Sequence, residues 1–376
     1  MVTAPYDIVM LGTFAVWRLG TLQARALPFA RELSARGLRC AIVTTPGDMP
    51  SERGVIETID GVAVINTESA GLNPAPAVRE QLAWITDLQP KIIHVFKPRG
   101  YGGLAAQRCL GNIPVVVDCD DWEGDGGWNQ HGSYSLPQRR LFDWQERTLQ
   151  VRADAVTAAS TLLAHRAALL RGSPATVSRI PNGLSPTWID TLSAGGEAKA
   201  GSEQPLTILL YSRFEEFPGD WPTVFARALR ACHPEVRIVG VGGGTSSEIE
   251  QMGYVARDSL PGVLGRADIA VYPYLDSLIT RSKQSVKLLE LMASGCAVVA
   301  SDVGENPAVL GDAGVLVPGH DPVVFASEVA ALIEDRHMAA RLGERAQQRA
   351  RDTFSVPFIV DELLRVYTEL GIAACH

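Results

Sequence analysis

The fold class is decided by residues 285–300, which read SVKLLELMASGCAVVA. Ser285 favours the N-cap of a helix and Gly295 favours its end, so the spacing predicts a helix between them. The apolar run that follows, residues 297–299, is typical of a strand buried on both faces of a parallel sheet. Similar apolar runs recur along the chain and alternate with helical patterns such as residues 22–36. This alternation predicts an α/β fold.

The chain has 376 residues, a length that favours two domains of ordinary size. Residues 191–205, TLSAGGEAKAGSEQP, have the Gly, Ala, Ser and Glu content of a linker. We therefore predict an N-terminal Rossmann-like domain over 1–190 and a C-terminal one over 206–355, both doubly wound and facing a cleft. Residues 356–376 carry apolar positions at helical spacing, and we expect this helix to dock back toward the N-terminal domain.

The charge distribution excludes several classes of partner. Residues 1–190 hold 18 basic and 18 acidic residues, which leaves 16 and 24 for the remainder of the chain. This balance gives no general attraction to nucleic acid and no basic run that follows anionic lipid. No apolar stretch is long enough for a membrane span, and no secretory signal is visible at the start. We expect a cytoplasmic protein with reduced, scattered cysteines, without stable membrane insertion and at most in transient contact with a membrane.

The predicted helix at 285–295 also has the features of an anion site. A helix N-terminus offers free backbone N–H groups and the positive end of the helix dipole, and Lys287 adds a cation beside them. Glu290 lies one turn further on the same face, where a carboxylate can accept hydrogen bonds from neutral hydroxyls such as those of ribose. By itself, this pair is also compatible with an ordinary surface ion pair.

The surrounding sequence resembles the glycosyltransferases of family 4, which are retaining enzymes of the GT-B fold. Residues 287–304 resemble the donor-site signature of that family, with the helix, the glycine stop, the buried strand and an Asp-Val-Gly turn in order. Residues 180–184, IPNGL, resemble the turn that ends the first domain. Residues 211–214, YSRF, resemble the Gly-Arg-Leu element that opens the second domain. The resemblance covers nearly the whole chain.

The resemblance implies a nucleotide-diphosphate sugar, of the UDP or GDP type, as co-substrate, with no further cofactor and no metal required. Asp120 falls at the position of a family histidine that touches the donor sugar, and Arg213 and Lys287 would stabilise the leaving diphosphate. The residues implied for donor binding are Gly12, Arg213, Val255, Ser285, Val286, Lys287 and Glu290. The residues expected at the sugar or at a small-molecule, saccharide or lipid-linked acceptor are His94, Asp121 and Ser282.

Several positions depart from the family pattern or allow another interpretation. Ser282 stands where most members carry the first of two glutamates. Residues 118–120 also form an Asp-x-Asp pattern of the kind that binds metals in the other glycosyltransferase fold, and residues 240–244 partly match a dinucleotide loop. His94 is also compatible with a buried, hydrogen-bonded position at a strand end. The aromatic residues around 122–144 suit either stacking on a sugar or acceptor, or packing of a long loop.

Two alternative functions remain open at this point. A nucleotide-sugar 2-epimerase of the same fold would convert the donor without an acceptor. A catalytically silent nucleotide-sugar binding module would bind the nucleotide without hydrolysis or transfer, and the missing carboxylate at Ser282 motivates this alternative.

Overall fold

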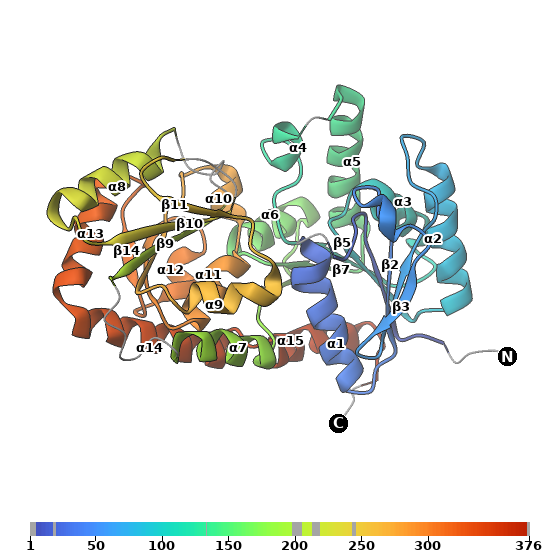
Figure 1. The fold of residues 1–376 in the computed structure, drawn as a ribbon. Helices are drawn as coiled ribbons and strands as arrows, with labels where there is room; N and C mark the ends of the chain where they lie inside the picture. The colour runs from blue at the N-terminus through green and yellow to red at the C-terminus, as the bar shows by residue number, and fades with distance from the viewer. Residues whose placement is uncertain are drawn as a thin grey trace. The chain divides into compact units, whose positions relative to one another are not determined.

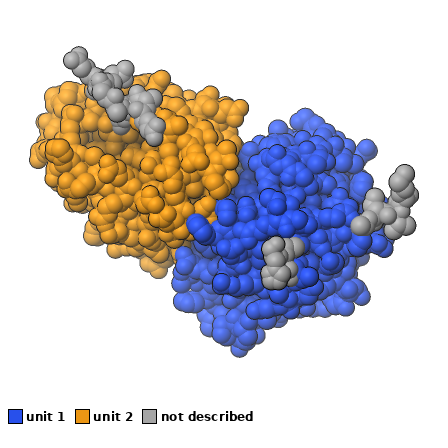
Figure 2. Space-filling model, turned by 90° about the horizontal axis from the view of Figure 1, so that it is seen from below, with its two compact units in different colours: residues 1–182, 282–284, 356–376 blue, residues 183–281, 285–355 orange. Residues whose placement is uncertain are grey.

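The protein is described by a computed structural model that covers residues 5–17, 20–132, 134–197, 205–212, 219–242 and 246–373. The chain forms two compact units, shown in blue and orange in Figure 2. Unit 1 comprises residues 1–182, 282–284 and 356–376, and unit 2 comprises residues 183–281 and 285–355. The boundary follows Asn182 and thus lies before the predicted domain end at residue 190.

Unit 1 contains an eight-stranded sheet in the order β3-β4-β2-β1-β5-β6-β7-β8. All neighbouring strands are parallel except β3 and β4. The strands are β1 (Ile8–Leu11), β2 (Cys40–Thr44), β3 (Ile56–Ile59), β4 (Val62–Asn66), β5 (Ile92–Phe96), β6 (Val115–Cys119), β7 (Ala155–Ala158) and β8 (Val177–Arg179). Most of the strand residues are buried, as the apolar runs in the sequence predict.

Helices cover both faces of this sheet (Figure 1). They are the π-helical turn η1 (Leu22–Ala26), α1 (Leu27–Ala35), the 3-10 turn η2 (Pro50–Glu52), α2 (Ala75–Leu88), α3 (Gly100–Cys109), α4 (Trp128–His131), α5 (Leu136–Arg152), α6 (Thr161–Arg171) and α15 (Val356–Glu369). Helix α15 comes from the end of the chain and contacts α1. Its apolar residues Ile359, Leu363 and Val366 belong to the same core cluster as β1 and α1, so this helix is an integral part of unit 1.

Unit 2 contains a six-stranded, fully parallel sheet in the order β11-β10-β9-β12-β13-β14. The strands are β9 (Thr207–Tyr211), β10 (Arg237–Val241), β11 (Glu250–Gly253), β12 (Ile269–Tyr272), β13 (Ala297–Ser301) and β14 (Val315–Val317). Both sheets are doubly wound, with helices on both faces, so the predicted α/β class with two Rossmann-like domains is confirmed.

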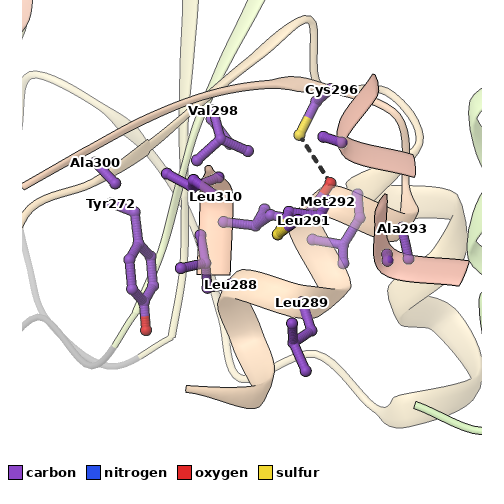
Figure 3. Packing of buried hydrophobic residues seen from close by; sticks show 14 of the residues in the cluster. Tyr272, Leu288, Leu289, Leu291, Met292, Ala293, Cys296, Val298, Ala300 and Leu310 are labelled. Carbon is purple, nitrogen blue, oxygen red and sulfur yellow. Dashed lines mark hydrogen bonds between the residues drawn. The ribbon is translucent and has the colours of Figure 1, made fainter. Parts of the chain in front are cut away.

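The remaining elements belong to unit 2. They are α7 (Pro186–Glu197), α8 (Trp221–Cys232), the 3-10 turn η4 (Arg257–Ser259), α9 (Leu260–Leu264), α10 (Leu278–Ser282), α11 (Val286–Ala293), α12 (Asn306–Leu310), α13 (Pro322–Glu334) and α14 (Arg336–Thr353). The predicted helix at 285–295 is α11, and Gly295 adopts a φ of +78° just after its end. Figure 3 shows α11 inserting Leu288, Leu291 and Met292 among apolar residues from β12 and β13.

The structure differs from the predicted linker over 191–205. Residues 191–197 continue helix α7, and Leu192 is fully buried; residues 198–204 lie outside the described range. The small residues have a packing role, because a Cβ on Gly195 would lie 2.4 Å from the carbonyl oxygen of Pro261, at the start of α9. The small residues that resemble a linker in composition are instead what allows α7 and α9 to lie in close contact.

Each sheet has one point where the strand order reverses, and these points select the places where ligands bind in such folds. In unit 1 it lies between β1 and β5, and in unit 2 it lies between β9 and β12. Among the helices of the described residues, none combines the length and apolar character needed to cross a bilayer.

Candidate donor site and the carboxylate cluster of unit 1

Glu290 is the central residue of the carboxyl edge of the sheet in unit 2. Its side chain is only 5% exposed although it carries a carboxylate. Trp188 Nε1 of α7 donates a hydrogen bond to Oε1 at 3.1 Å, and Tyr211 Oη at the end of β9 donates to Oε2 at 2.9 Å. Burial raises the pKa of Glu290, while Arg257, with Nη1 at 3.9 Å from Oε1, and the two hydrogen bonds oppose that shift. Glu290 is thus held in one orientation at the switch point.

The start of α11 lies beside this carboxylate. Lys287 is the second residue of the helix, and its Nζ lies 5.5 Å from the centroid of the Tyr211 ring. Ser285 occupies the N-cap position with an extended backbone, as predicted, but its side chain makes no capping hydrogen bond. Its Oγ instead accepts a hydrogen bond from Tyr272 Oη at 2.5 Å. The N-cap position of Ser285 is thus as predicted, and its hydroxyl is engaged by a tyrosine at the end of β12.

Sequence reasoning missed Trp188 and Arg257. The Arg257 guanidinium carbon lies 4.1 Å from the centroid of the Trp188 ring, and both residues face Glu290. Trp188 is 102 positions from Glu290 in the chain, and no spacing within a single element links the two. The only local signal is the helix start at residues 185–186, which places Trp188 in the first turn of α7.

Lys97 and three carboxylates form the corresponding cluster in unit 1. Lys97 Nζ lies 2.8 Å from Asp121 Oδ2, 2.6 Å from Glu123 Oε1 and 3.4 Å from Asp120 Oδ1. The carboxylates are close enough together to share one cation, and the lysine ammonium supplies that charge here. Although burial lowers the pKa of Lys97, the surrounding carboxylates hold it well above its usual range.

Asp120 differs from the other acids of this cluster. Burial raises its pKa to about 6, even though Lys97 opposes the shift. Thr21 Oγ1 donates a hydrogen bond to Oδ2, whereas Oδ1 is buried and accepts no hydrogen bond among the described residues. For Asp121, burial favours the neutral form, but Lys97 and Lys283 hold the pKa below its usual value. Asp120 Oδ1 therefore lies in an ion pair with Lys97 but has capacity to accept a further hydrogen bond.

Lys97 was also missed from the sequence, but here a signal existed. It follows β5 directly, and β5 pairs in parallel with β6, which leads to Asp120. The carboxyl ends of parallel strands share one edge of the sheet, so a cation after β5 and acids after β6 are expected to meet. Lys97 adopts a φ of +54°, which is unfavourable for a residue with a side chain. This backbone conformation indicates a functional constraint at the position.

His94 lies inside the sheet, and this corrects its expected contact with a sugar or acceptor. The residue is 0% exposed. Its Nδ1 lies 2.6 Å from Tyr367 Oη of α15, and its Nε2 lies 3.1 Å from Thr157 Oγ1 of β7. Burial lowers the pKa of His94 to about 4. The physical reason is its position in the middle of β5, in which all five residues are buried. The geometry therefore supports the interpretation of His94 as a buried histidine.

The remaining predicted residues lie as follows. Gly12 follows β1, and a Cβ there would lie 2.4 Å from Leu22 Cδ1 and 2.6 Å from Thr44 Oγ1, so a larger residue would displace these side chains. Val255 lies in the loop after β11 and packs against the core of unit 2. Ser282 ends α10 and is buried, and Val286 is the half-buried first residue of α11. Arg213 lies outside the described residues.

A cavity of about 500 Å³ in unit 2 is lined by none of these residues. Its walls come from residues 220–221 and 318–322, near the end of β14. The geometry of α11 and the strand order therefore favour the edge at Glu290, and not this open hollow, as the candidate donor site.

Two family models match the chain. The family described as "Glycosyl transferases group 1" matches residues 205–335, and a "Glycosyl transferase 4-like domain" matches residues 20–183. A D-inositol 3-phosphate glycosyltransferase of Corynebacterium efficiens is 36% identical over 112 residues, which are 28% of this chain and only 26% of that relative.

Two longer alignments cover most of both chains. A D-inositol 3-phosphate glycosyltransferase of Corynebacterium diphtheriae is 28% identical over 95% of this chain and 92% of its own length. A phosphatidyl-myo-inositol mannosyltransferase of Mycobacterium leprae is 24% identical over 93% of this chain and 92% of its own length.

Solved structures show the same fold. Sucrose-phosphate synthase from Thermosynechococcus elongatus superposes with a TM-score of 0.74 at 19% identity, over 97% of this chain and 99% of that one. Anabaena HepE in complex with UDP and glucose superposes with a TM-score of 0.70 at 15% identity, over 97% of this chain and 100% of that one. With both units matched and the whole fold shared, the chain belongs to the group 1 glycosyltransferases of the GT-B fold.

Proposed function

We propose that the protein transfers a sugar from a nucleotide-diphosphate sugar to an acceptor, with the nucleotide bound by unit 2. The observation that carries this proposal is the edge at Glu290, where a fixed carboxylate, Lys287 and the N-terminus of α11 lie together at the switch point of the sheet. A carboxylate suits ribose hydroxyls, and a helix N-terminus with a lysine suits a diphosphate.

In this proposal, negative charge grows on the diphosphate as the bond to the sugar breaks. Lys287, Arg213 and the backbone at Ser285 and Val286 stabilise that charge, and Glu290 holds the ribose. The backbone near Val255 holds the base.

In this proposal, the carboxylate cluster of unit 1 contacts the sugar or the acceptor. Asp120 Oδ1 accepts a hydrogen bond from the sugar or orients the acceptor, and Asp121 lies next to it. Transfer proceeds with retention, and the acceptor proton passes to the departing phosphate oxygen. A metal is not required, a proposal supported by the position of Lys97 Nζ among the carboxylates that offer the ligands for one. We expect Asp120→Asn to impair transfer more than nucleotide binding.

We propose a UDP or GDP sugar as the donor, which is supported by the UDP bound in the HepE structure. The acceptor is a small molecule, a saccharide or a lipid-linked molecule, since the relatives above are named for inositol phosphate and phosphatidyl-inositol acceptors. The proposed location is the cytoplasm, with transient contact with a membrane.

The first test is a thermal-shift panel with UDP, GDP, ADP, dTDP and CDP in the presence of a chelator. A nucleotide at about 100 times its dissociation constant adds roughly 2.7 kcal/mol to the free energy of unfolding. We expect one nucleotide to stabilise the wild type but not Lys287→Ala. Lys91→Ala is the matched control, because Lys91 lies at the surface of unit 1 and pairs with Asp7. No stabilisation by any nucleotide would contradict the proposal.

A product analysis with the corresponding nucleotide sugar then separates transfer from the alternatives. Conversion of the donor to its 2-epimer without an acceptor would identify an epimerase. Tight nucleotide binding without hydrolysis or transfer would identify a silent binding module. Release of the nucleoside diphosphate, accelerated by an acceptor, is the result expected for a transferase.

A further inference from the structure

Helix α5 carries an exposed apolar and basic stripe that the glycosyltransferase proposal does not use. The stripe consists of Leu136, Arg140, Trp144, Arg147 and Val151, which follow one another at intervals of four, four, three and four residues. This spacing places all five side chains on one face of the helix. Leu136 is 61% exposed, Trp144 53% and Val151 48%, and both arginines are exposed.

The opposite face of α5 anchors the helix to unit 1. Leu149 belongs to the core cluster under the sheet, and Gln145 is fully buried and bonded to the backbone of Gly100. A capping box between Ser135 and Gln138 fixes the start of the helix. The α5 stripe therefore lies on a helix whose other face is well packed against unit 1.

The two acidic residues of α5, Asp143 and Glu146, are bound by other parts of unit 1. Glu146 is buried and pairs with both terminal nitrogens of Arg166 on α6 at 2.7 Å. Asp143 accepts a hydrogen bond from the backbone of Asp125 at 2.5 Å. Helix α6, which contacts α5, has no acidic residue between Thr161 and Arg171, and its Leu169 is 82% exposed.

We propose that the α5 stripe docks unit 1 on an anionic lipid bilayer. A helix face with a tryptophan between two arginines and an aliphatic side chain at each end matches the interface of a membrane whose headgroups are negative. The apolar side chains enter the boundary between headgroups and acyl chains, and each arginine lays its aliphatic stem on that boundary while its guanidinium reaches lipid phosphate. The stripe lies on the surface of the bilayer and does not span it.

This inference does not depend on the proposed enzymatic activity, because it is tested by binding alone. Purified full-length protein is sedimented with phosphatidylcholine vesicles and with vesicles that also contain phosphatidylglycerol. We expect binding to the anionic vesicles only, and a steep loss of binding as salt is raised. Arg140→Glu/Arg147→Glu is expected to lower the partition coefficient at least about tenfold, since each arginine near an anionic surface contributes about fivefold.

The control variant is Arg336→Glu/Arg341→Glu, which makes the same change of net charge at exposed arginines of α14 in unit 2. It is expected to bind as the wild type does. If the α5 variant is poorly folded by circular dichroism, Arg140→Gln/Arg147→Gln and the salt titration of the wild type carry the test. A blue shift of tryptophan emission on adding anionic vesicles, absent in Trp144→Ala, checks that the stripe itself makes the contact.

Three results would overturn the inference. The first is no binding to either kind of vesicle, and the second is equal loss of binding in the α5 and α14 variants. The third is concentration-dependent dimerisation in sedimentation that the α5 variant abolishes while vesicle binding is absent, because a second copy of the chain would then be what covers the stripe.

Discussion

The two units have the same kind of sheet edge but opposite chemistry at it. In unit 2, the switch point between β9 and β12 gathers a fixed carboxylate, a lysine at a helix start and aromatic side chains. In unit 1, the switch point between β1 and β5 leads to Lys97, which is enclosed by three carboxylates. A shared topology thus provides the place, while the residues after the strands decide which ligand charge is favourable there.

The two edges differ in the partners that stabilise their buried charge. Glu290 is held by two neutral hydrogen-bond donors and by Arg257, and the cation Lys287 lies near the Tyr211 ring. Lys97, in contrast, is already neutralised by acids of its own unit. We infer that unit 2 is prepared for an anionic ligand and unit 1 for hydroxyl groups.

Removal of the cation from the unit 1 cluster has the largest expected effect. Lys97→Met removes the one cation that contacts all three carboxylates, although Arg99 still pairs with Glu123, and should lower the free energy of unfolding at pH 7 by about 3 kcal/mol or more. Urea denaturation measures this loss. Lys97→Arg keeps the charge and is the control. A loss similar in both variants would mean that side-chain shape, and not charge balance, holds the cluster.

Removal of the corresponding cation in unit 2 should change the free energy of unfolding little and lower the rate of the reaction. Lys287→Ala is expected to lower turnover of the nucleotide sugar on the order of 100-fold, by analogy with the loss of one donor that stabilises a developing negative charge. Steady-state kinetics with the donor found in the nucleotide panel measure the effect. Unchanged turnover would contradict the proposed role of Lys287. It would also contradict the inference that the unit 2 edge, unlike the unit 1 edge, is suited to an anionic ligand.

The pH dependence of stability sharpens the comparison further. The pKa of Asp120 is raised in the folded protein to about 6, so the folded state binds more protons than the unfolded state between about pH 4 and 6. The contribution of Asp120 to stability is therefore present at low pH and is lost as pH rises through about 6. Relative to wild type, Asp120→Asn should gain on the order of 2 kcal/mol between pH 4 and pH 7.

Urea denaturation of both proteins at the two pH values checks this expectation. A relative loss for Asp120→Asn as pH rises would show that Lys97 stabilises the ionised form more than burial destabilises it.

The smallest expected effect concerns the orientation of Glu290. Tyr211→Phe removes one hydrogen bond to a buried carboxylate and should cost about 1.5 kcal/mol of unfolding free energy. Tyr254→Phe is the matched control, because Tyr254 is 72% exposed in the same unit and should change stability little. Equal stability of the two variants in urea denaturation would mean that Trp188 alone is sufficient to hold Glu290.

Particular residues show where prediction from the sequence succeeds. The helix at α11, with Ser285 before it and Gly295 after it, follows from local preferences, and so do the buried strands on either side. The prediction fails at residues 191–197, where Gly195 permits close helix contact and does not mark a flexible segment. The total charge of residues 1–190 is balanced, yet this sum hides the two exposed arginines, Arg140 and Arg147, that lie on one face of α5.

The sequence by itself determined the α/β class, the two-domain organisation, the α11 motif and the resemblance to a glycosyltransferase family, because these depend on residue order and short spacings. Only the tertiary structure decided that Trp188 fixes Glu290, that Lys97 neutralises the cluster at Asp120, and that His94 is enclosed by Tyr367 and Thr157. These contacts join elements far apart in the chain. They exist because strand order and helix packing bring the elements together, and no local pattern encodes that order.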